Sequence, residues 1–308
     1  MKTLIVALFL IATPALAATD SFGITQVYQT AGNTWSADWI ANRTLSSGTR
    51  DGLLVARGDG TITIGSGIAT MTGSAPRMYL YNALKQKIWG DVEITFYARR
   101  ISETQTLSYQ GFTAAAKIDH TDDNDICGTR GYYGRMLYDG RMDFEKEINH
   151  HATDGYVQFG SVKPWSAVPK NTWIGYKFIA YDNGPNVNFE LYRDLTGGTN
   201  GGTWIKMTSA TDSGQLGAGL TPCAPGIDPT QIMNGKNVSI MIRNDGLGQA
   251  QYKWFSVREI ATTTQVAPPI PPPATTTDKT AQMKSIIDSL IAIMQGVISS
   301  LNLLKTLL

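Results

Sequence analysis

The sequence predicts an all-β protein, a sandwich of two antiparallel sheets, followed by a separate helical segment. Short runs of strand-forming residues follow one another closely and are divided by Gly, Pro, Asn, Asp and Ser. Residues 92–100 show a clear alternation, with Val92, Ile94, Phe96 and Ala98 on one side of the expected strand. No helical period is present between residues 42 and 260, and the composition changes abruptly after residue 261. Regular short strands with turn signals between them are typical of a β-sandwich.

The composition fits a well-packed extracellular domain. The chain has 308 residues, of which 42% are hydrophobic and 17% are charged. This is enough for a sizeable core and too apolar for a disordered chain. Lys and Arg number 26 against 25 Asp and Glu, so no basic field exists to attract nucleic acid. We therefore expect no nucleic-acid partner.

Residues 1–17 have the features of a secretory signal peptide. Lys2 is the charged start, residues 4–11 are apolar, and Ala15-Leu16-Ala17 is a small-residue cleavage site. A membrane anchor is the alternative, but the apolar run is too short to span a bilayer. We expect a secreted or extracellular protein, attached to the cell surface or free, whose fold occupies residues 18–261.

The two cysteines, Cys127 and Cys223, both lie in loop-like stretches. Two thiols in an oxidising compartment are most simply explained by a disulfide, with two free thiols as the alternative. A bond that closes a loop near 100 residues would contribute about 4.7 kcal/mol by the chain-entropy model.

The predicted strands follow one another along the whole domain. In chain order they are residues 22–28, 53–56, 61–64, 69–72, 78–81, 92–100, 111–118, 131–138, 141–149, 173–181, 187–193, 204–207, 238–243 and 252–260.

The hairpin predicted at residues 131–149 carries the most unusual pattern in the chain. Asp139-Gly140 is a strong turn signal between two strand-forming runs. Because side chains alternate along a strand, Asp143, Glu145 and Glu147 share one face. Three carboxylates in alternate positions repel one another, so this face is either solvated or lies in a cleft that uses them.

This acidic strand in an all-β exported domain resembles the concanavalin A-like lectin/glucanase superfamily. The resemblance spans residues 19–260 and implies a jelly roll with a glycan groove on its concave sheet. Laminarinase-type members carry Glu-x-Asp-x-Glu on a concave strand, where this chain has Asp143-x-Glu145-x-Glu147 with Asp in first place. Alginate-lyase-type members carry Gln-Ile-His, which Ile118-Asp119-His120 matches loosely.

Glycoside hydrolysis is the first enzymatic function to consider. It needs two carboxyl groups, about 5 to 5.5 Å apart in retaining enzymes, and residues two apart on a strand are separated by about 6.6 Å. Glu145 and Glu147 are the candidate nucleophile and acid, with Asp143 shifting the pKa of one of them. Charge balancing by Arg99, Arg135 or Arg141 is the structural alternative.

Two other functions remain open. A polysaccharide lyase needs a cation to neutralise a uronate, a base and an acid. A non-catalytic lectin, or a surface adhesin or structural protein, needs only a binding face. The candidate substrate-binding side chains, with Trp165 expected on an exposed loop, are Arg99, His120, Arg130, Tyr132, Arg135, Arg141, His150 and Trp165.

An acidic loop lies next to Cys127. Asp119, Asp122, Asp123 and Asp125 place four carboxylates within seven residues. Hard oxygen ligands at this density suit Ca²⁺, although the spacing is not that of an EF-hand loop. A solvated acidic loop is the alternative.

The C-terminal region is predicted to be a separate module. Residues 262–277 form a Pro/Thr-rich linker, which is extended and semi-rigid. Residues 278–308 have an apolar heptad repeat, typical of a coiled coil. We expect self-association through this helix; membrane attachment by it and packing on its own sandwich are the alternatives. The heptad positions are Met283, Ile287, Leu290, Met294, Val297, Leu301, Leu304 and Leu308.

Overall fold

The computed structural model describes residues 18–105, 107–121, 124–150 and 152–265. The predicted signal peptide (1–17) and heptad helix (278–308) lie outside the described residues. The described elements are β1 (Tyr28–Ser36), β2 (Arg43–Ser46), β3 (Arg50–Asp51), β4 (Leu54–Gly65), β5 (Ile68–Leu80), β6 (Val92–Glu103), β7 (Gly111–Ile118), β8 (Gly131–Leu137), β9 (Met142–Glu147), β10 (Tyr156–Val162), β11 (Ile174–Asn183), β12 (Asn186–Asp194), η1 (Thr199–Gly201), β13 (Ile205–Asp212), β14 (Ser239–Arg243) and β15 (Leu247–Gln265).

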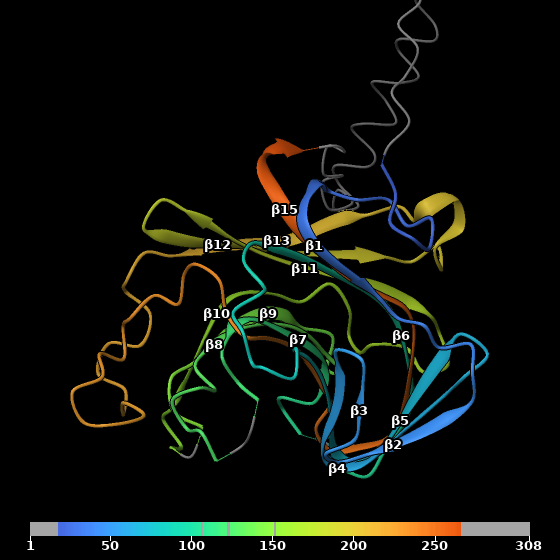
Figure 1. The fold of residues 1–308 in the computed structure, drawn as a ribbon, viewed down its shortest axis with the longest axis horizontal. Helices are drawn as coiled ribbons and strands as arrows, with labels where there is room; N and C mark the ends of the chain where they lie inside the picture. Colours follow the sequence, from blue (N-terminus) through green and yellow to red (C-terminus); the bar gives the residue numbers. More distant parts are fainter. Residues whose placement is uncertain (1–17, 106, 122–123, 151, 266–308) are drawn as a thin grey trace, which may run out of the picture. The chain divides into compact units, whose positions relative to one another are not determined.

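The strands form one antiparallel sheet that folds over itself into two layers. Its order is β10-β9-β8-β7-β14-β5-β15-β6-β11-β12-β13, and Figure 1 shows β11–β13 lying over β7–β10. Phe189 on β12 packs across the gap against Tyr132 on β8, with ring centroids 4.6 Å apart, and against Phe144 on β9, at 5.6 Å. The core therefore lies between the layers, and the prediction of an all-β antiparallel fold is confirmed.

β4 and β5 pass from one layer to the other, which corrects the strand prediction. Four short strands were expected, at 53–56, 61–64, 69–72 and 78–81, but they are the halves of two long strands. The chain bends at glycines: Gly60 has φ 107°, and a Cβ there would stand 1.9 Å from the carbonyl oxygen of Thr72. Glycine lets the two backbones cross closely without ending the ladder.

The β8–β9 hairpin has the predicted turn and the predicted alternation. Gly140 has φ 91°, as a turn glycine requires, and Met136 pairs with Met142 on either side of the turn. On β9, Met142 and Phe144 belong to the core cluster. The intervening carboxylates therefore point away from the core, on the outer face of their layer.

The two ends of the domain differ from the prediction. Residues 22–28 were expected to form a strand, but β1 begins only at Tyr28. The backbone N–H groups of Val27 and Tyr28 donate to Glu93 Oε2, at 3.0 and 3.3 Å, so this segment is held by a buried carboxylate. At the other end, β15 continues to Gln265, into the predicted linker.

No helix in the described part of the chain is long and apolar enough to cross a membrane.

Candidate functional site

A groove of about 490 Å³ opens on the outer face of the layer that contains β7–β10. We call it the arginine groove. Its lining comes from β5, β9, β10, β14 and the neighbouring loops: Arg77, Tyr109, Glu145, His150, Thr153, Tyr156, Gln158, Arg243 and Asp245.

A row of arginines passes through this groove, and two of its members, Arg77 and Arg243, line it. Backbone pairing brings Arg135 on β8, Thr113 on β7, Arg243 on β14, Arg77 on β5 and Arg57 on β4 into register. Neighbouring strands lie about 4.8 Å apart, so these side chains form one line across five strands. Two of them, Arg57 and Arg77, also line a neighbouring hollow of about 510 Å³, which extends the groove.

The carboxylates predicted to be catalytic are held in ion pairs. Arg135 donates from Nε and Nη2 to Asp143, at 2.7 and 3.0 Å, and from Nη1 to Glu145 Oε2. Arg243 Nη2 donates to Glu145 Oε1 at 2.9 Å. Both oxygens of Glu145 are therefore occupied by guanidinium groups, and Asp143 is balanced across the strand. This arrangement favours the charge-balancing role for both residues.

Glu147 is also held as an anion. Its Oε1 lies 2.7 Å from Nδ1 of His150. Burial by itself would raise the pKa of Glu147, but the hydrogen bond from His150 and the charge of Arg243 outweigh it and lower the pKa below its usual range. A general acid needs the opposite shift, so Glu147 is suited to accept hydrogen bonds rather than to donate a catalytic proton.

This depressed pKa predicts a specific pH dependence. A carboxylate whose folded pKa lies below its unfolded value stabilises the fold above the unfolded pKa, about 4.3. That contribution is lost as the pH falls through the folded pKa. In urea titrations between pH 7 and pH 3, we expect Glu147→Gln to flatten the loss of unfolding free energy in acid. Asp38→Asn, at an exposed carboxylate, is the control; equal acid slopes for Glu147→Gln and wild type would contradict the assignment.

Three predicted residues lie in or beside the groove. His150 lines it, and its ring centroid is 6.1 Å from that of His120. His120 itself is buried, with Nδ1 2.9 Å from the hydroxyl of Tyr79. Arg141 stands at the hairpin turn, where it pairs with Asp139 at 2.7 Å.

Four other predicted residues lie elsewhere. Tyr132 was predicted to bind substrate, but it lies on the opposite face of β8 from Arg135, where it faces the core and donates to Asp212 at 2.7 Å. Arg99 belongs to β6 in the other layer, and Arg130 donates to Gln231 at 2.8 Å. Trp165, expected to be exposed, is partly buried against the core with Arg193 stacked 4.3 Å from its ring.

The groove residues that the sequence did not reveal come from distant strands. Arg77 and Arg243 come together because β14 lies between β5 and β7 and pairs with both. No local sequence pattern predicts that pairing. Tyr156 and Gln158 lie on β10, which was not predicted as a strand. Tyr156 and Gln158 are two residues apart, a spacing that places both side chains on the same face of a strand.

The calcium prediction finds no support in the described part of the loop. Asp119 accepts from the N–H of Val238 at 3.0 Å and pairs with Lys87 at 3.0 Å, and Asp125 accepts from the N–H of Gly128. Asp122 and Asp123 lie outside the described residues. Among the residues described, no group of three or more His, Cys, Asp or Glu is placed to hold a metal ion.

The disulfide prediction is confirmed. Cys127 and Cys223 are bonded, with Cα atoms 5.2 Å apart. The loop that contains Cys223 also touches the wall of the arginine groove: Asn149 Nδ2 donates to the carbonyl of Pro222 at 3.0 Å, and Thr221 donates to Asp154 at 2.9 Å. The disulfide thereby helps to hold the segment that presents His150.

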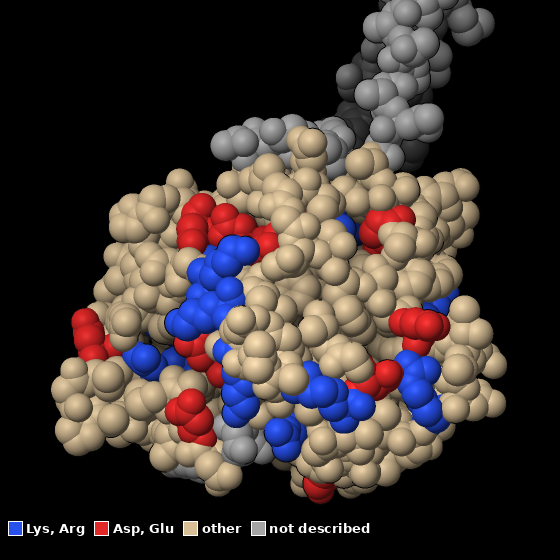
Figure 2. All heavy atoms as spheres, viewed as in Figure 1, with Lys and Arg blue, Asp and Glu red and all other residues tan. Residues whose placement is uncertain are grey.

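Figure 2 shows acidic and basic side chains interleaved on one face of the molecule, without a large patch of one sign. This agrees with the near-zero net charge of the sequence. Such a surface recognises a partner by local geometry rather than by a long-range field.

No known family model matches the sequence, and no curated protein matches it. Among solved structures, the chain is similar to the VIP36 exoplasmic/lumenal domain in its Ca²⁺/Man-bound form, at 9% identity and TM-score 0.42, covering 71% of this chain and 90% of that one. It is also similar to the metal-free carbohydrate recognition domain of Emp46p, at 10% identity and TM-score 0.39, covering 68% of this chain and 89% of that one. A third similar structure is peanut lectin with a 9mer peptide, at 11% identity and TM-score 0.34, covering 75% of this chain and 100% of that one. At TM-scores this low, the likenesses carry no conclusion about what this chain binds.

Proposed function

We propose that this chain is an extracellular polysaccharide-binding protein whose ligand lies in the arginine groove. The observation that carries the proposal is the ion-paired floor of the groove. Glu145 is held by the buried Arg135 and by Arg243, so the two groove-lining residues Glu145 and Arg243 are fixed in place before a ligand arrives. Preorganised side chains bind with a smaller loss of entropy on association.

The chemistry of the lining matches a sugar. Sugar hydroxyls donate and accept at once, and the groove offers guanidinium donors, carboxylate acceptors and the amide of Gln158. Tyr109, which is 45% exposed, and Tyr156 offer ring faces for the apolar side of a sugar ring. The Cys127–Cys223 disulfide supports an extracellular setting.

A lyase is the second candidate, favoured by three neighbouring side chains. Arg243 would neutralise a uronate carboxylate, while His150 and Tyr156 are proton-transfer groups in the same groove. The Tyr156 hydroxyl donates to the carbonyl of His150 at 2.9 Å, which joins the two. Hydrolysis by Glu145 and Glu147 has less support, because neither carboxylate has the surroundings of a proton donor.

One polysaccharide panel separates these functions. We expect alginate, pectin, laminarin or hydroxyethyl cellulose to retard the full-length protein in native gels. Tyr109→Ala combined with Gln158→Ala should weaken that binding at least tenfold, since buried aromatic contacts are often worth about 2 kcal/mol or more. Leu84→Ala combined with Gln86→Ala, at exposed positions away from the groove, is the matched control.

The same samples are read for reaction products. New ultraviolet absorbance from unsaturated uronates would establish the lyase. Reducing ends whose release falls about 10²- to 10⁴-fold in Glu145→Gln would restore the hydrolase. If no polymer is retarded, or the groove variant binds as the control does, the arginine groove is not the binding site.

A further inference from the structure

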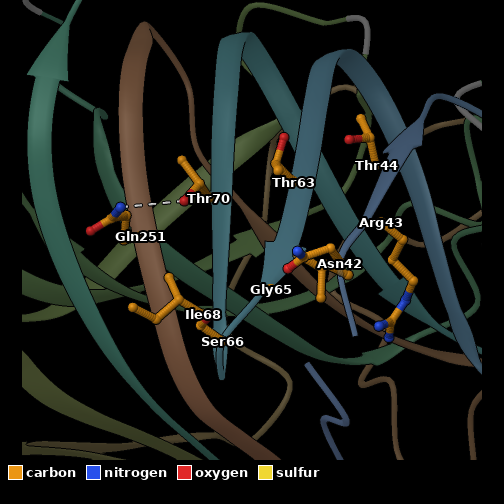
Figure 3. Close-up of a pocket in the computed structure, with 10 residues that line it drawn as sticks. Asn42, Arg43, Thr44, Thr63, Gly65, Ser66, Ile68, Thr70 and Gln251 are labelled. Carbon is orange, nitrogen blue, oxygen red and sulfur yellow. Dashed lines mark hydrogen bonds between the residues drawn. The ribbon is translucent and has the colours of Figure 1, made fainter. Parts of the chain in front are cut away.

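A second hollow, of about 630 Å³, lies over β2, β4, β5 and β15 (Figure 3). It lies at the C-terminal end of β4 and at the start of β5, whereas Arg57 and Arg77 lie toward the opposite ends of these two strands. We call it the threonine groove. Its polar lining consists of Asn42, Arg43, Thr44, Thr63, Ser66, Thr70 and Gln251.

Backbone register sets four of these side chains in a line. Thr44 pairs with Thr63, Thr63 with Thr70, and Thr70 with Gln251, on four successive strands (Figure 3). Gln251 Nε2 donates to Thr70 Oγ1 at 3.3 Å, and Arg99 Nε donates to Gln251 Oε1 at 2.9 Å. Because strands lie about 4.8 Å apart, the line offers hydroxyl and amide groups at a regular repeat.

The threonine groove carries little charge. Arg43 is the one charged residue that lines it, and Arg43 Nε donates to Asp51 at 2.6 Å. None of the lining residues is a carboxylate. An uncharged ligand rich in hydroxyl groups matches this surface, since Thr hydroxyls and Gln amides both donate and accept hydrogen bonds.

Aromatic rings continue the line beyond Gln251. The guanidinium of Arg99 lies 4.7 Å from the ring centroid of Trp173, and Lys253 Nζ lies 5.0 Å from it. Trp173 and Trp254 are both partly exposed. Cations therefore lie over both indole rings, and the part of each ring that stays exposed adds apolar surface beside the polar row.

We propose that the threonine groove is a second carbohydrate site, which takes an uncharged polysaccharide strand laid across β2, β4, β5 and β15. It is separate from the arginine groove on which the proposed function rests. Two sites on one chain raise the apparent affinity for a long polymer, because the second contact becomes intramolecular.

Native gels with and without hydroxyethyl cellulose, galactomannan or dextran test the second site in the full-length protein. Thr44→Lys with Thr63→Lys places two bulky cations in the groove at exposed positions. Thr211→Lys with Ser213→Lys adds the same charge at the exposed end of β13 and serves as the control. We expect the first pair to raise the dissociation constant at least tenfold and the control to bind like wild type.

Three results would overturn this second site. The first is that none of the three polymers retards the wild-type protein. The second is that the two lysine double variants bind equally well. The third is that the Tyr109→Ala and Gln158→Ala changes alone abolish binding completely. The last result would leave the arginine groove as the site of the proposed function. Partial binding in that variant, abolished by adding the Thr44 and Thr63 changes, supports both grooves.

Discussion

Replacing Arg135 by Met is expected to lower the free energy of unfolding by about 3 to 5 kcal/mol. Arg135 is fully buried and donates to both Asp143 and Glu145. Without the guanidinium, two carboxylates remain buried with less compensation, which is the costly way to break a buried ion pair. Urea unfolding at pH 7 measures the loss.

Arg141→Met is the matched control. Arg141 is only partly buried and pairs with the exposed Asp139, so its removal should cost less than about 1 kcal/mol. Adding Asp143→Asn and Glu145→Gln to Arg135→Met should recover some of the lost stability, because the uncompensated charges are gone. Equal losses for Arg135→Met and Arg141→Met would show that the buried pair contributes nothing special.

Removing the disulfide is the second change expected to have a large effect. Cys127 and Cys223 are 96 residues apart in the sequence, so their bond closes a long loop in the unfolded chain. Cys127→Ser with Cys223→Ser should lower the free energy of unfolding by about 2 to 5 kcal/mol. Thermal unfolding under oxidising conditions measures the difference.

A reductant provides the internal check on this change. It should destabilise the wild-type protein by a similar amount and leave the double serine variant unaffected. The serine variant should also bind the ligand of the arginine groove more weakly, because Asn149 and Asp154 lose their fixed partners at Pro222 and Thr221. Unchanged stability in both experiments would mean that the loops hold their positions without the bond.

The sequence predicted well what depends on local patterns. The alternation of Asp143, Glu145 and Glu147 against Met142 and Phe144 is a property of one strand, and the structure has it. The Asp139-Gly140 turn depends on four neighbouring residues. The disulfide followed from the predicted export and from a count of two cysteines.

The groove escaped prediction because it is made by pairing between distant strands. Arg243 meets Arg77 because β14 lies beside β5. Glu145 and Arg243 meet across β7 and β8, which lie between their two strands. The sequence of a single hairpin also does not reveal whether a carboxylate on it pairs with an arginine on a more distant strand. The sequence therefore predicts that the three acidic residues share one face of β9, but it does not predict which partners hold them.

β4 and β5 carry Arg57 and Arg77 at one end of their pairing and Thr63 and Thr70 at the other. Tension between two glycan chains held in the two grooves would run lengthwise along this strand pair. Because each of these two strands carries one of these side chains at each end, the load would pass along the covalent backbones of β4 and β5 rather than through the hydrogen bonds between them. If both grooves bind, the hairpin is therefore built as a tether that resists pulling in the direction in which a matrix polymer would strain it.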